Sequence, residues 1–342
     1  MKTTRRDFLT AGSMLALSSG ALPLTTAKAD DKSDADYLNP IGGVISVAVT
    51  PYHEDHTIDT ETMTSVSERL GQAGADGIFV AGSTGDMALL TIPEREALIA
   101  ATRKGLGTTK KICAGIGDWS IPAMVDNTKR FRDAGADVAV VMAPIMFFVY
   151  SPAEMTAFFT EIADRSALPI LLYHHARVST PIEPETIFAI ADHPNIIGMK
   201  ETGANFERTE QILGGVKGKD FVVMQGNEPY VVKSLKIGCR GVLSALAGVW
   251  PELFHELVRS CRAGDDAAYD KAAAKLTDMT HLFLGLMPVA KSFSYFGLTM
   301  KQMLKYRGWI DNTNVRMPGF TPDPAWEPEL YEFLAKNGFP KK

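Results

Sequence analysis

The sequence predicts a (β/α)8 TIM barrel with an additional helical layer at its C-terminal end. Eight short apolar runs recur along the chain, and successive runs end about 20 to 35 residues apart, close to the ~30 residues of one strand-plus-helix unit. Each run is apolar along its whole length, as in parallel strands that are covered on both faces. An open doubly wound sheet is the alternative, but no G-x-G-x-x-G motif follows any run.

The predicted strands form a regular series through the first three quarters of the chain. In chain order they are Val44–Thr50, Gly77–Ala81, Ile112–Gly115, Val138–Ala143, Ile170–Tyr173, Ile196–Lys200, Phe221–Gln225 and Gly241–Ala245.

Helix signals lie between these strands. Proline followed by an acidic residue, which is typical of a first helical turn, occurs at Pro93–Glu96, Pro152–Glu154 and Pro251–Glu252. Two similar segments, Ala73–Gly77 and Ala134–Val138, each combine a helix end, a glycine stop and the start of the next strand. Their recurrence supports repeated strand–helix units.

The N-terminal 29 residues resemble an export signal. Arg5 and Arg6 precede a mildly apolar stretch, and Ala27–Ala29 offers a small-x-small cleavage site. Paired arginines with weak apolarity are typical of the twin-arginine route, so we expect a periplasmic protein. An amphipathic N-terminal helix is the alternative. No other segment approaches the ~20 apolar residues of a membrane span, so we expect no stable membrane association after signal removal.

The rest of the chain divides into three predicted parts. Residues 30–38 are polar and read as a linker, residues 39–250 form the barrel, and residues 251–342 form C-terminal helices and a tail. Helical patterns at Ala267–Leu286 and Val289–Tyr306 exceed what eight strand–helix units need. We therefore expect an appended layer that caps the barrel or builds an oligomer interface.

Composition excludes several classes of protein. The 342 residues are 22% charged and 46% hydrophobic, which is typical of a folded chain and excludes disorder, collagen and a polytopic membrane protein. The formal net charge of −5 leaves no basic excess for nucleic acid. Cys113, Cys239 and Cys261 form no CxxC pair, and their odd number gives no closed disulfide framework, so we interpret them as buried thiols.

Candidate reactive groups come from one end of the predicted barrel, because TIM-barrel sites are built where strands end at their carboxyl side. The polar or otherwise notable residues at these positions are Thr50, Ser83, Thr84, Asp86, Asp118, Pro144, Tyr173, His174, His175, Lys200, Glu201, Asn227, Glu228 and Ser244.

Lys200 is the most informative of them. It closes the apolar run Asn195–Met199, which places its side chain at a crowded opening where an ammonium is costly to desolvate. A neutral amine attacks ketones to form an imine. A lysine that extends to solvent, or that pairs with Glu201, is the alternative.

Tyr173 ends the preceding strand, and adjacent strands lie only ~5 Å apart. A phenol beside an amine can carry protons during imine formation, whereas a core aromatic residue is the alternative. Ser83 and Thr84 lie between Gly82 and Gly85, in a turn whose N–H and hydroxyl groups suit a carboxylate. Together these groups predict a site for a 2-oxo acid.

The motifs in which these residues lie resemble a known family, the Schiff-base-forming lyases typified by dihydrodipicolinate synthase and N-acetylneuraminate lyase. Gly82–Thr91 resembles the G-T-T-G-E-x-x-x-L-T segment, Ile197–Glu201 the G-[IV]-K-[ED] motif, and Tyr173 the tyrosine of the Y-N segment. Gly226–Glu228 is similar to the late G-x-[DE] motif, and Pro288–Lys291 to the P-x-x-x-K start of the C-terminal helices.

The resemblance runs from Gly43 to Pro318 and implies roles for particular residues. Lys200 is the implied imine former, Tyr173 the proton shuttle, and Ser83 with Thr84 the carboxylate and relay site, with Thr84 counted among the catalytic residues. The remaining substrate-binding candidates are Arg177, Thr202, Gly226 and Ser244. The resemblance implies no metal, no organic cofactor and a homotetramer.

The chain departs from the family pattern at two places. The Y-N-x-P segment is here Tyr173–Ala176, and Arg177 matches the arginine that grips a second carboxylate only if one residue is gapped. Pro144 is followed by Ile145–Phe148, without the relay tyrosine of dihydrodipicolinate synthase. These departures and the export signal favour a substrate outside lysine biosynthesis. The acid Asp86 of the Gly82–Asp86 segment and the missing tyrosine are also similar to the hydroxyproline-pathway branch, which deaminates a pyrroline carboxylate.

His174 and His175 have no counterpart in that pattern. A histidine pair can bind metal, but no third ligand lies nearby in sequence, so we expect hydrogen bonds to substrate or neighbouring groups. The predicted function is a Schiff-base-forming lyase that acts on a 2-oxo acid by aldol cleavage, condensation or dehydration. A pyrroline-carboxylate deaminase, or an exported 2-oxo acid binding protein without turnover, is the alternative.

Overall fold

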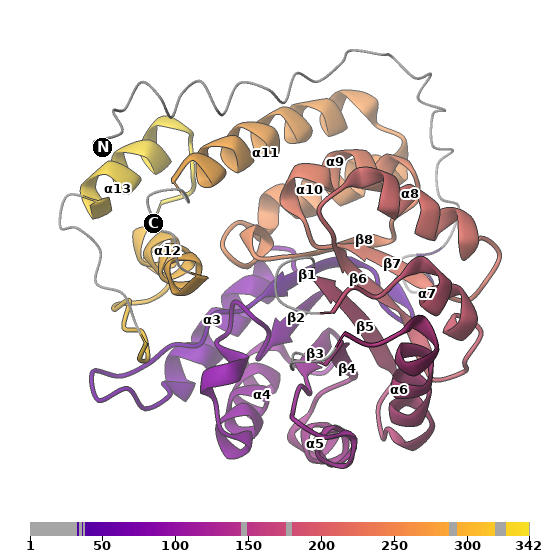
Figure 1. Ribbon diagram of the computed structural model, residues 1–342. Helices are drawn as coiled ribbons and strands as arrows, with labels where there is room; N and C mark the ends of the chain where they lie inside the picture. Colours follow the sequence, from indigo (N-terminus) through magenta and orange to yellow (C-terminus); the bar gives the residue numbers. More distant parts are fainter. Residues whose placement is uncertain are drawn as a thin grey trace, which may run out of the picture.

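The strands close into a parallel barrel, as predicted. In a computed structural model, which describes residues 33, 36, 38–144, 149–175, 180–286, 293–318 and 326–341, eight strands pair in chain order and β8 pairs with β1. Figure 1 shows these strands at the centre of the molecule with helices around them. The strands are β1 (Gly43–Val47), β2 (Gly77–Val80), β3 (Lys111–Gly115), β4 (Val138–Met142), β5 (Ile170–His175), β6 (Ile196–Thr202), β7 (Val222–Gln225) and β8 (Gly241–Ser244).

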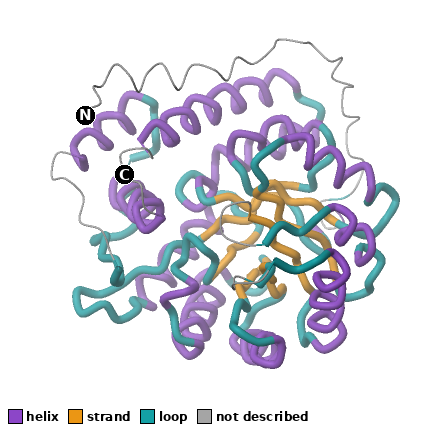
Figure 2. Tube along the Cα trace, viewed as in Figure 1, coloured by secondary structure: helices purple, strands orange, loops and turns teal. Residues whose placement is uncertain are grey.

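A ring of helices covers the outer face of the barrel, one after each strand (Figure 2). The ring consists of α3 (Thr60–Gln72), α4 (Ile92–Leu106), α5 (Ile121–Ala134), α6 (Pro152–Arg165), α7 (Pro184–Ile190), α8 (Phe206–Gly215), α9 (Glu228–Lys236) and α10 (Pro251–Ala263). Short 3-10 turns, η1 (Met87–Leu89) and η2 (Leu246–Gly248), follow β2 and β8.

The helix boundaries have local causes that the sequence contains. Helix α4 begins with a capping box in which Thr91 and Glu94 satisfy each other's backbone N–H groups, and α6 repeats the device with Ser151 and Glu154. Helix α5 ends at Gly135, whose φ of 111° lies in the left-handed region.

Apolar side chains form two separate layers. Inside the barrel, one cluster includes Ile45, Phe79, Leu171, Tyr173 and Leu243. Residues that alternate with these point outward and join the larger layer between the strands and the helices. This alternation decides which strand-end side chains reach the interior and which lie behind the barrel wall.

The helical segment beyond β8 serves two purposes. Helix α10, within the predicted C-terminal region, follows β8 and contacts β1, so it completes the ring. Helices α11 (Asp266–Leu286), α12 (Phe293–Tyr306) and α13 (Trp326–Lys336) lie outside the ring and form the expected additional layer (Figure 1).

Other sequence-based expectations meet the structure only in part. The export signal of residues 1–29 lies outside the described residues. Cys113 and Cys239 are buried, Cys261 is partly buried, and none forms a disulfide among the described residues. Within the described ranges, no helix combines the length and apolarity that crossing a membrane requires.

Candidate active site

Lys200 and Tyr173 lie side by side inside the barrel. They are register partners on β6 and β5, and the Lys200 Nζ lies 4.1 Å from the centroid of the Tyr173 ring. The Phe79 ring of β2 lies 5.3 Å from the same nitrogen. Lys200 is only 4% exposed and Tyr173 only 1% exposed. The predicted amine–phenol pair is therefore almost fully buried inside the barrel.

A bulge in β6 establishes this register. Ile170 pairs with Ile196, but Leu171 pairs with Gly198, so Ile197 is an extra residue on β6. A side chain at Gly198 would come within 2.1 Å of the Val222 carbonyl oxygen, so only glycine fits there. After the bulge, the alternation along β6 turns Lys200 inward, opposite Tyr173.

Gly226, which follows β7, provides the space that the lysine occupies. A Cβ at this position would lie 2.6 Å from the Lys200 Cε and 2.3 Å from the Thr202 Oγ1. The backbone N–H of Gly226 donates to the Glu201 carbonyl at 2.8 Å, which holds the end of β7 against β6. Gly226 thus borders the site, and its lack of a side chain leaves room for Lys200.

The loop Gly82–Asp86 brings its first hydroxyl to the tyrosine. The Ser83 Oγ lies 3.3 Å from the Tyr173 OH, within hydrogen-bonding distance. Thr84 is the next residue in the loop and is buried. The hydroxyl that contacts Tyr173 is therefore that of Ser83, and Thr84 lies beside this contact.

Strands β5 and β6 extend two residues further than predicted. His174 pairs with Glu201 and His175 with Thr202, because the backbone ladder continues past Tyr173 and Lys200. Alternation places His175 on the same face as Tyr173, and their rings meet edge to face at 5.9 Å. The Thr202 Oγ1 is buried without a hydrogen-bond partner in the part of the chain that the structure describes.

His174 points the other way, into a polar cluster behind the barrel wall. Its Nδ1 accepts from the Ile182 N–H at 3.3 Å, and its Nε2 lies 3.9 Å from the Glu201 Oε1. Burial lowers the pKa of His174 to about 3 and raises the pKa of Glu201 to about 7. The Arg208 Nε donates to the other Glu201 oxygen at 3.2 Å, which opposes that rise. The two histidines therefore have different surroundings, and only His175 faces the site.

Two predicted substrate-binding residues are not part of the described site. Ser244 follows Leu243, which faces the interior, so its own side chain turns outward. There its hydroxyl donates to the Glu228 Oε1 at 2.7 Å and accepts from the Ala247 N–H at 3.4 Å. Ser244 thus supports the turn after β8. Arg177 lies outside the described residues.

A separate cavity of about 630 Å³ opens beside the loops after β2, β3 and β4. Its lining includes Met87, Asp118, Trp119 and Pro144, but neither Lys200 nor Tyr173. We place the site at the lysine, because the reactive groups converge there. Across the described ranges, no three His, Cys, Asp or Glu side chains come together as a metal site would require.

An inward lysine beside a phenol at the carboxyl ends of barrel strands defines an enzyme class, the Schiff-base-forming lyases or class I aldolases. Comparison with known proteins identifies the family. The model of the Dihydrodipicolinate synthetase family matches residues 40–336. The chain belongs to this family and is a lyase that acts on a 2-oxo acid.

Individual relatives and structures agree with this assignment. The chain is 30% identical over 247 residues to the 4-hydroxy-tetrahydrodipicolinate synthase of Xylella fastidiosa (strain Temecula1), covering 72% of this chain and 81% of the relative. The dihydrodipicolinate synthase structure from Aquifex aeolicus superposes with a TM-score of 0.78 at 26% identity, covering 88% and 100% of the two chains. YagE of E. coli K12, solved with pyruvate, shares the fold, with a TM-score of 0.80 at 24% identity over 87% of this chain and 99% of YagE.

Structure adds residues that the sequence did not single out. Phe79 contacts the lysine from β2, and its inward position follows from the two-residue alternation of the strand. Tyr52, Glu94 and Arg316 meet around the Gly82–Asp86 loop, as described below. No local pattern indicates this last group, because Arg316 is more than 200 residues from its partners.

Proposed function

We propose that Lys200 forms an imine with the ketone carbon of a pyruvate-type 2-oxo acid. Its nitrogen attacks the carbonyl carbon, a carbinolamine forms, and loss of one water gives the protonated imine. That cation withdraws electrons from the adjacent carbon, so a carbon–carbon bond there can break or form, or a leaving group can depart. Hydrolysis of the imine then restores the free lysine.

The contact between the Tyr173 and Ser83 hydroxyls is the observation that supports this proposal most strongly. A phenol whose ring lies 4.1 Å from the lysine nitrogen is placed to donate and remove the protons of carbinolamine dehydration. The Ser83 hydroxyl, 3.3 Å away, extends this path to the loop. Ser83 and Thr84 then hold the substrate carboxylate by hydroxyl and backbone N–H groups, next to the ketone that the amine attacks.

The outer part of the substrate meets His175 and Thr202. Both continue the strands beyond Tyr173 and Lys200 and face the same side. An imidazole and a hydroxyl that has no partner among the described residues suit a substrate with oxygen substituents beyond the ketone. We therefore propose a hydroxylated or carboxylated 2-oxo acid, with these two residues contacting the part that leaves or joins.

A product assay tests the reaction. The full-length protein is incubated with 2-oxo acids, alone and with aldehydes, and separately with a pyrroline carboxylate, while pyruvate and ammonia are measured. Aldol chemistry gives pyruvate release or consumption that Lys200→Met abolishes, whereas Lys233→Met, an exposed lysine near the Phe206 ring, leaves it intact. Ammonia from a pyrroline carboxylate would instead identify the deaminase, and turnover that survives Lys200→Met would refute the imine.

We propose export to the periplasm by the twin-arginine route. The proposal is supported by three features in the order of an export signal: the twin arginines Arg5-Arg6, a weakly apolar stretch, and the small-x-small site Ala27-Lys28-Ala29. The expected result is a periplasmic protein whose N-terminus begins near residue 30. Replacement of both arginines by lysine should leave the uncleaved chain in the cytoplasm. A mature protein that still begins at Met1 would contradict the proposal.

We also propose a homotetramer. Trp119 and Val149 are 79% and 89% exposed, which is unusual for large apolar side chains and suggests that other copies of the chain cover them. Light scattering should give four times the 37.2 kDa chain mass, less any removed signal. Trp119→Asp should lower that mass, and a monomeric wild-type protein would refute the assembly.

A further inference from the structure

The loop that carries Ser83 and Thr84 is held in a strained conformation. Ala81 has a φ of 51° and Asp86 a φ of 59°, so two residues with side chains adopt the left-handed conformation at its two ends. Such a conformation is unfavourable for a residue with a side chain and persists only where surrounding contacts fix it. The contacts that fix this loop therefore decide where its hydroxyls lie.

Contacts from the segment after β1 hold the far end of the loop. The Thr50 Oγ1 donates to the Gly85 carbonyl at 2.7 Å, and the Tyr52 OH donates to the Asp86 Oδ2 at 3.2 Å. Tyr52 is fully buried and Asp86 is partly buried. The position of Asp86, three residues after Ser83, thus depends on the position of Tyr52.

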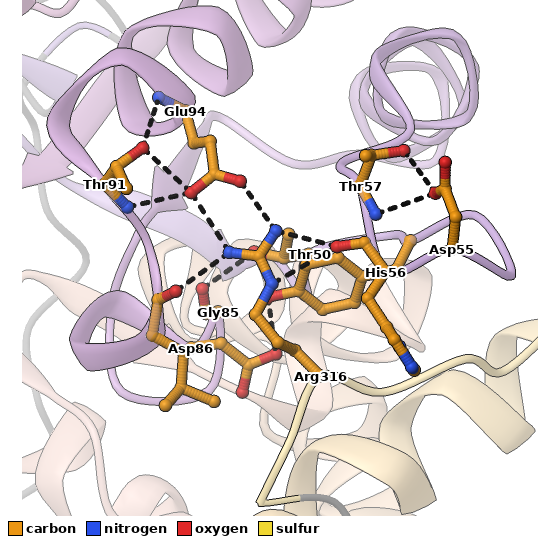
Figure 3. Close-up of polar contacts among 11 residues, drawn as sticks. Thr50, Asp55, His56, Thr57, Gly85, Asp86, Thr91, Glu94 and Arg316 are labelled. Atoms are coloured by element: carbon orange, nitrogen blue, oxygen red, sulfur yellow. Dashed lines mark hydrogen bonds and ion pairs between the residues drawn. The ribbon is translucent and has the colours of Figure 1, made fainter.

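Arg316, from the segment after α12, ties that region together. Figure 3 shows its guanidinium between Glu94 and His56. The Nη1 donates to the Leu89 carbonyl at 2.8 Å and to Glu94 at 3.0 Å, and the Nη2 to Glu94 at 2.6 Å and to the His56 carbonyl at 2.8 Å. The Arg316 Nε also donates to the His56 carbonyl, at 3.2 Å, so all five N–H donors of the guanidinium have acceptors. The guanidinium carbon also lies 4.9 Å from the centroid of the Tyr52 ring.

Helix α12 supports the same tyrosine from a second direction. The Lys301 Nζ lies 4.5 Å from the centroid of the Tyr52 ring and donates to the Asn314 carbonyl at 2.6 Å. The Asn314 side-chain amide donates to the Tyr52 carbonyl at 3.3 Å. Residues 301–316 therefore clamp Tyr52, whose hydroxyl holds Asp86.

We infer that Arg316 is a positioning residue for the Ser83–Thr84 loop. It binds the Leu89 carbonyl and lies over the ring of Tyr52, whose hydroxyl holds Asp86, and so keeps the Ser83 hydroxyl at 3.3 Å from the Tyr173 hydroxyl. The inference rests on the proposed function, in which this loop binds the substrate carboxylate. Arg316, in the C-terminal segment after α12, thereby influences the affinity of the Lys200 site for a 2-oxo acid.

The chain provides a matched control. Arg130 binds Glu96 through two contacts of 2.6 and 2.9 Å, a forked geometry like that of Arg316 and Glu94. Glu96 is two residues from Glu94 on the same helix, but among the described residues Arg130 contacts Glu96 and neither the loop nor Tyr52. Loss of Arg130 thus removes a comparable ion pair without touching the positioning contacts.

The experiment compares Arg316→Gln, Arg316→Lys and Arg130→Gln in the full chain. Lys200 is trapped with borohydride over a range of pyruvate concentrations, and hydrogen exchange of residues 83–90 is followed without ligand. Arg316→Gln should raise the half-saturating pyruvate concentration on the order of tenfold to a hundredfold, because small displacements of a binding group are costly. Exchange in residues 83–90 should also accelerate, while Arg130→Gln matches wild type in both readouts.

Arg316→Lys keeps the charge but has three donors in place of a five-donor fork, so it should show a smaller change in the same direction. It also serves if Arg316→Gln does not fold. Wild-type half-saturation and wild-type loop exchange in the folded Arg316 variants would overturn the inference. If wild type itself traps no pyruvate, the proposed function fails, and loop exchange alone then decides whether Arg316 positions the loop.

Discussion

The Lys200 nitrogen lies over the ring of Tyr173, 4.1 Å from its centroid, because the two residues are register partners on adjacent strands. The Tyr173 ring also meets the Phe79 ring edge to face, with the centroids 6.2 Å apart. The phenol hydroxyl, by contrast, reaches Ser83. One side chain thus packs against the amine and also carries the group that can move protons.

Tyr173→Phe separates these two contributions. The ring remains against Lys200 while the hydroxyl is lost, so borohydride should still trap pyruvate on Lys200, but more slowly, because the phenol no longer assists carbinolamine dehydration. Turnover should fall by about 10²- to 10⁴-fold, the usual contribution of a positioned acid–base group. Tyr269→Phe is the control, since that buried tyrosine also loses a hydrogen bond, to the Val232 carbonyl, but lies outside the site. Equal kcat values for wild type and Tyr173→Phe would exclude the phenol as proton carrier.

Gly226→Ala tests the space beside the lysine. The added methyl would lie 2.6 Å from the Lys200 Cε, which is the flexible end of a side chain, so the amine should move while the backbone stays. We expect a loss of imine trapping with a stability cost of about 1–3 kcal/mol. Gly214→Ala, where an added Cβ meets nothing within 4 Å, should retain trapping. Normal trapping in Gly226→Ala would show that Lys200 reacts from another position.

Thr202→Val tests whether the unpaired hydroxyl serves the substrate. Valine keeps the shape but removes a buried group without a partner among the described residues, a change that favours folding by about 1–3 kcal/mol. We expect a higher Tm together with a raised KM. Thr102→Val, which removes a hydroxyl that donates to the Leu98 carbonyl, should lower Tm and leave KM unchanged. A lower Tm and an unchanged KM in Thr202→Val would make its role structural.

His174 should make stability depend on pH. Its folded-state pKa of about 3 lies below the unfolded value near 6.5, so the unfolded chain binds a proton first as the pH falls. His174 should therefore lower the free energy of unfolding from pH 6.5 toward pH 3 by up to ~1.4 kcal/mol per pH unit, while the raised pKa of Glu201 opposes that fall between about pH 7 and pH 4.5. Urea titrations should show a shallower drop for His174→Asn, but the wild-type slope for the exposed control His255→Asn. The same slope in His174→Asn and wild type would contradict this account.

Sequence reasoning predicted the barrel well because its signals are local. Fully apolar strands, proline at first helical positions and glycine stops such as Gly135 each act within a few residues. Lys200 and Tyr173 were also predicted to be neighbours, since successive parallel strands adjoin. The predicted ends of β5 and β6 were less accurate. The pairs His174–Glu201 and His175–Thr202 depend on hydrogen bonding between two separate segments, which one segment alone does not reveal.

The inward or outward direction of a strand-end side chain was harder to predict. Ser244 follows an inward Leu243 and turns to Glu228, whereas a one-residue bulge at Ile197 brings Lys200 inward. Bulges and register are set by neighbouring strands, so a single strand does not reveal them. The contacts of Arg316 were beyond prediction for a related reason, since they join segments that only the folded chain brings together.

Reductive trapping followed by peptide mapping shows directly which lysine forms the imine. The full-length protein is treated with borohydride in the presence of pyruvate, and the modified peptide is identified by mass. The account predicts one reduced adduct, on Lys200, which is absent in Lys200→Met and without pyruvate. Lys301 is an equally buried lysine outside the site and provides an internal comparison. An unmodified Lys200, or an adduct on Lys301 instead, would contradict the account.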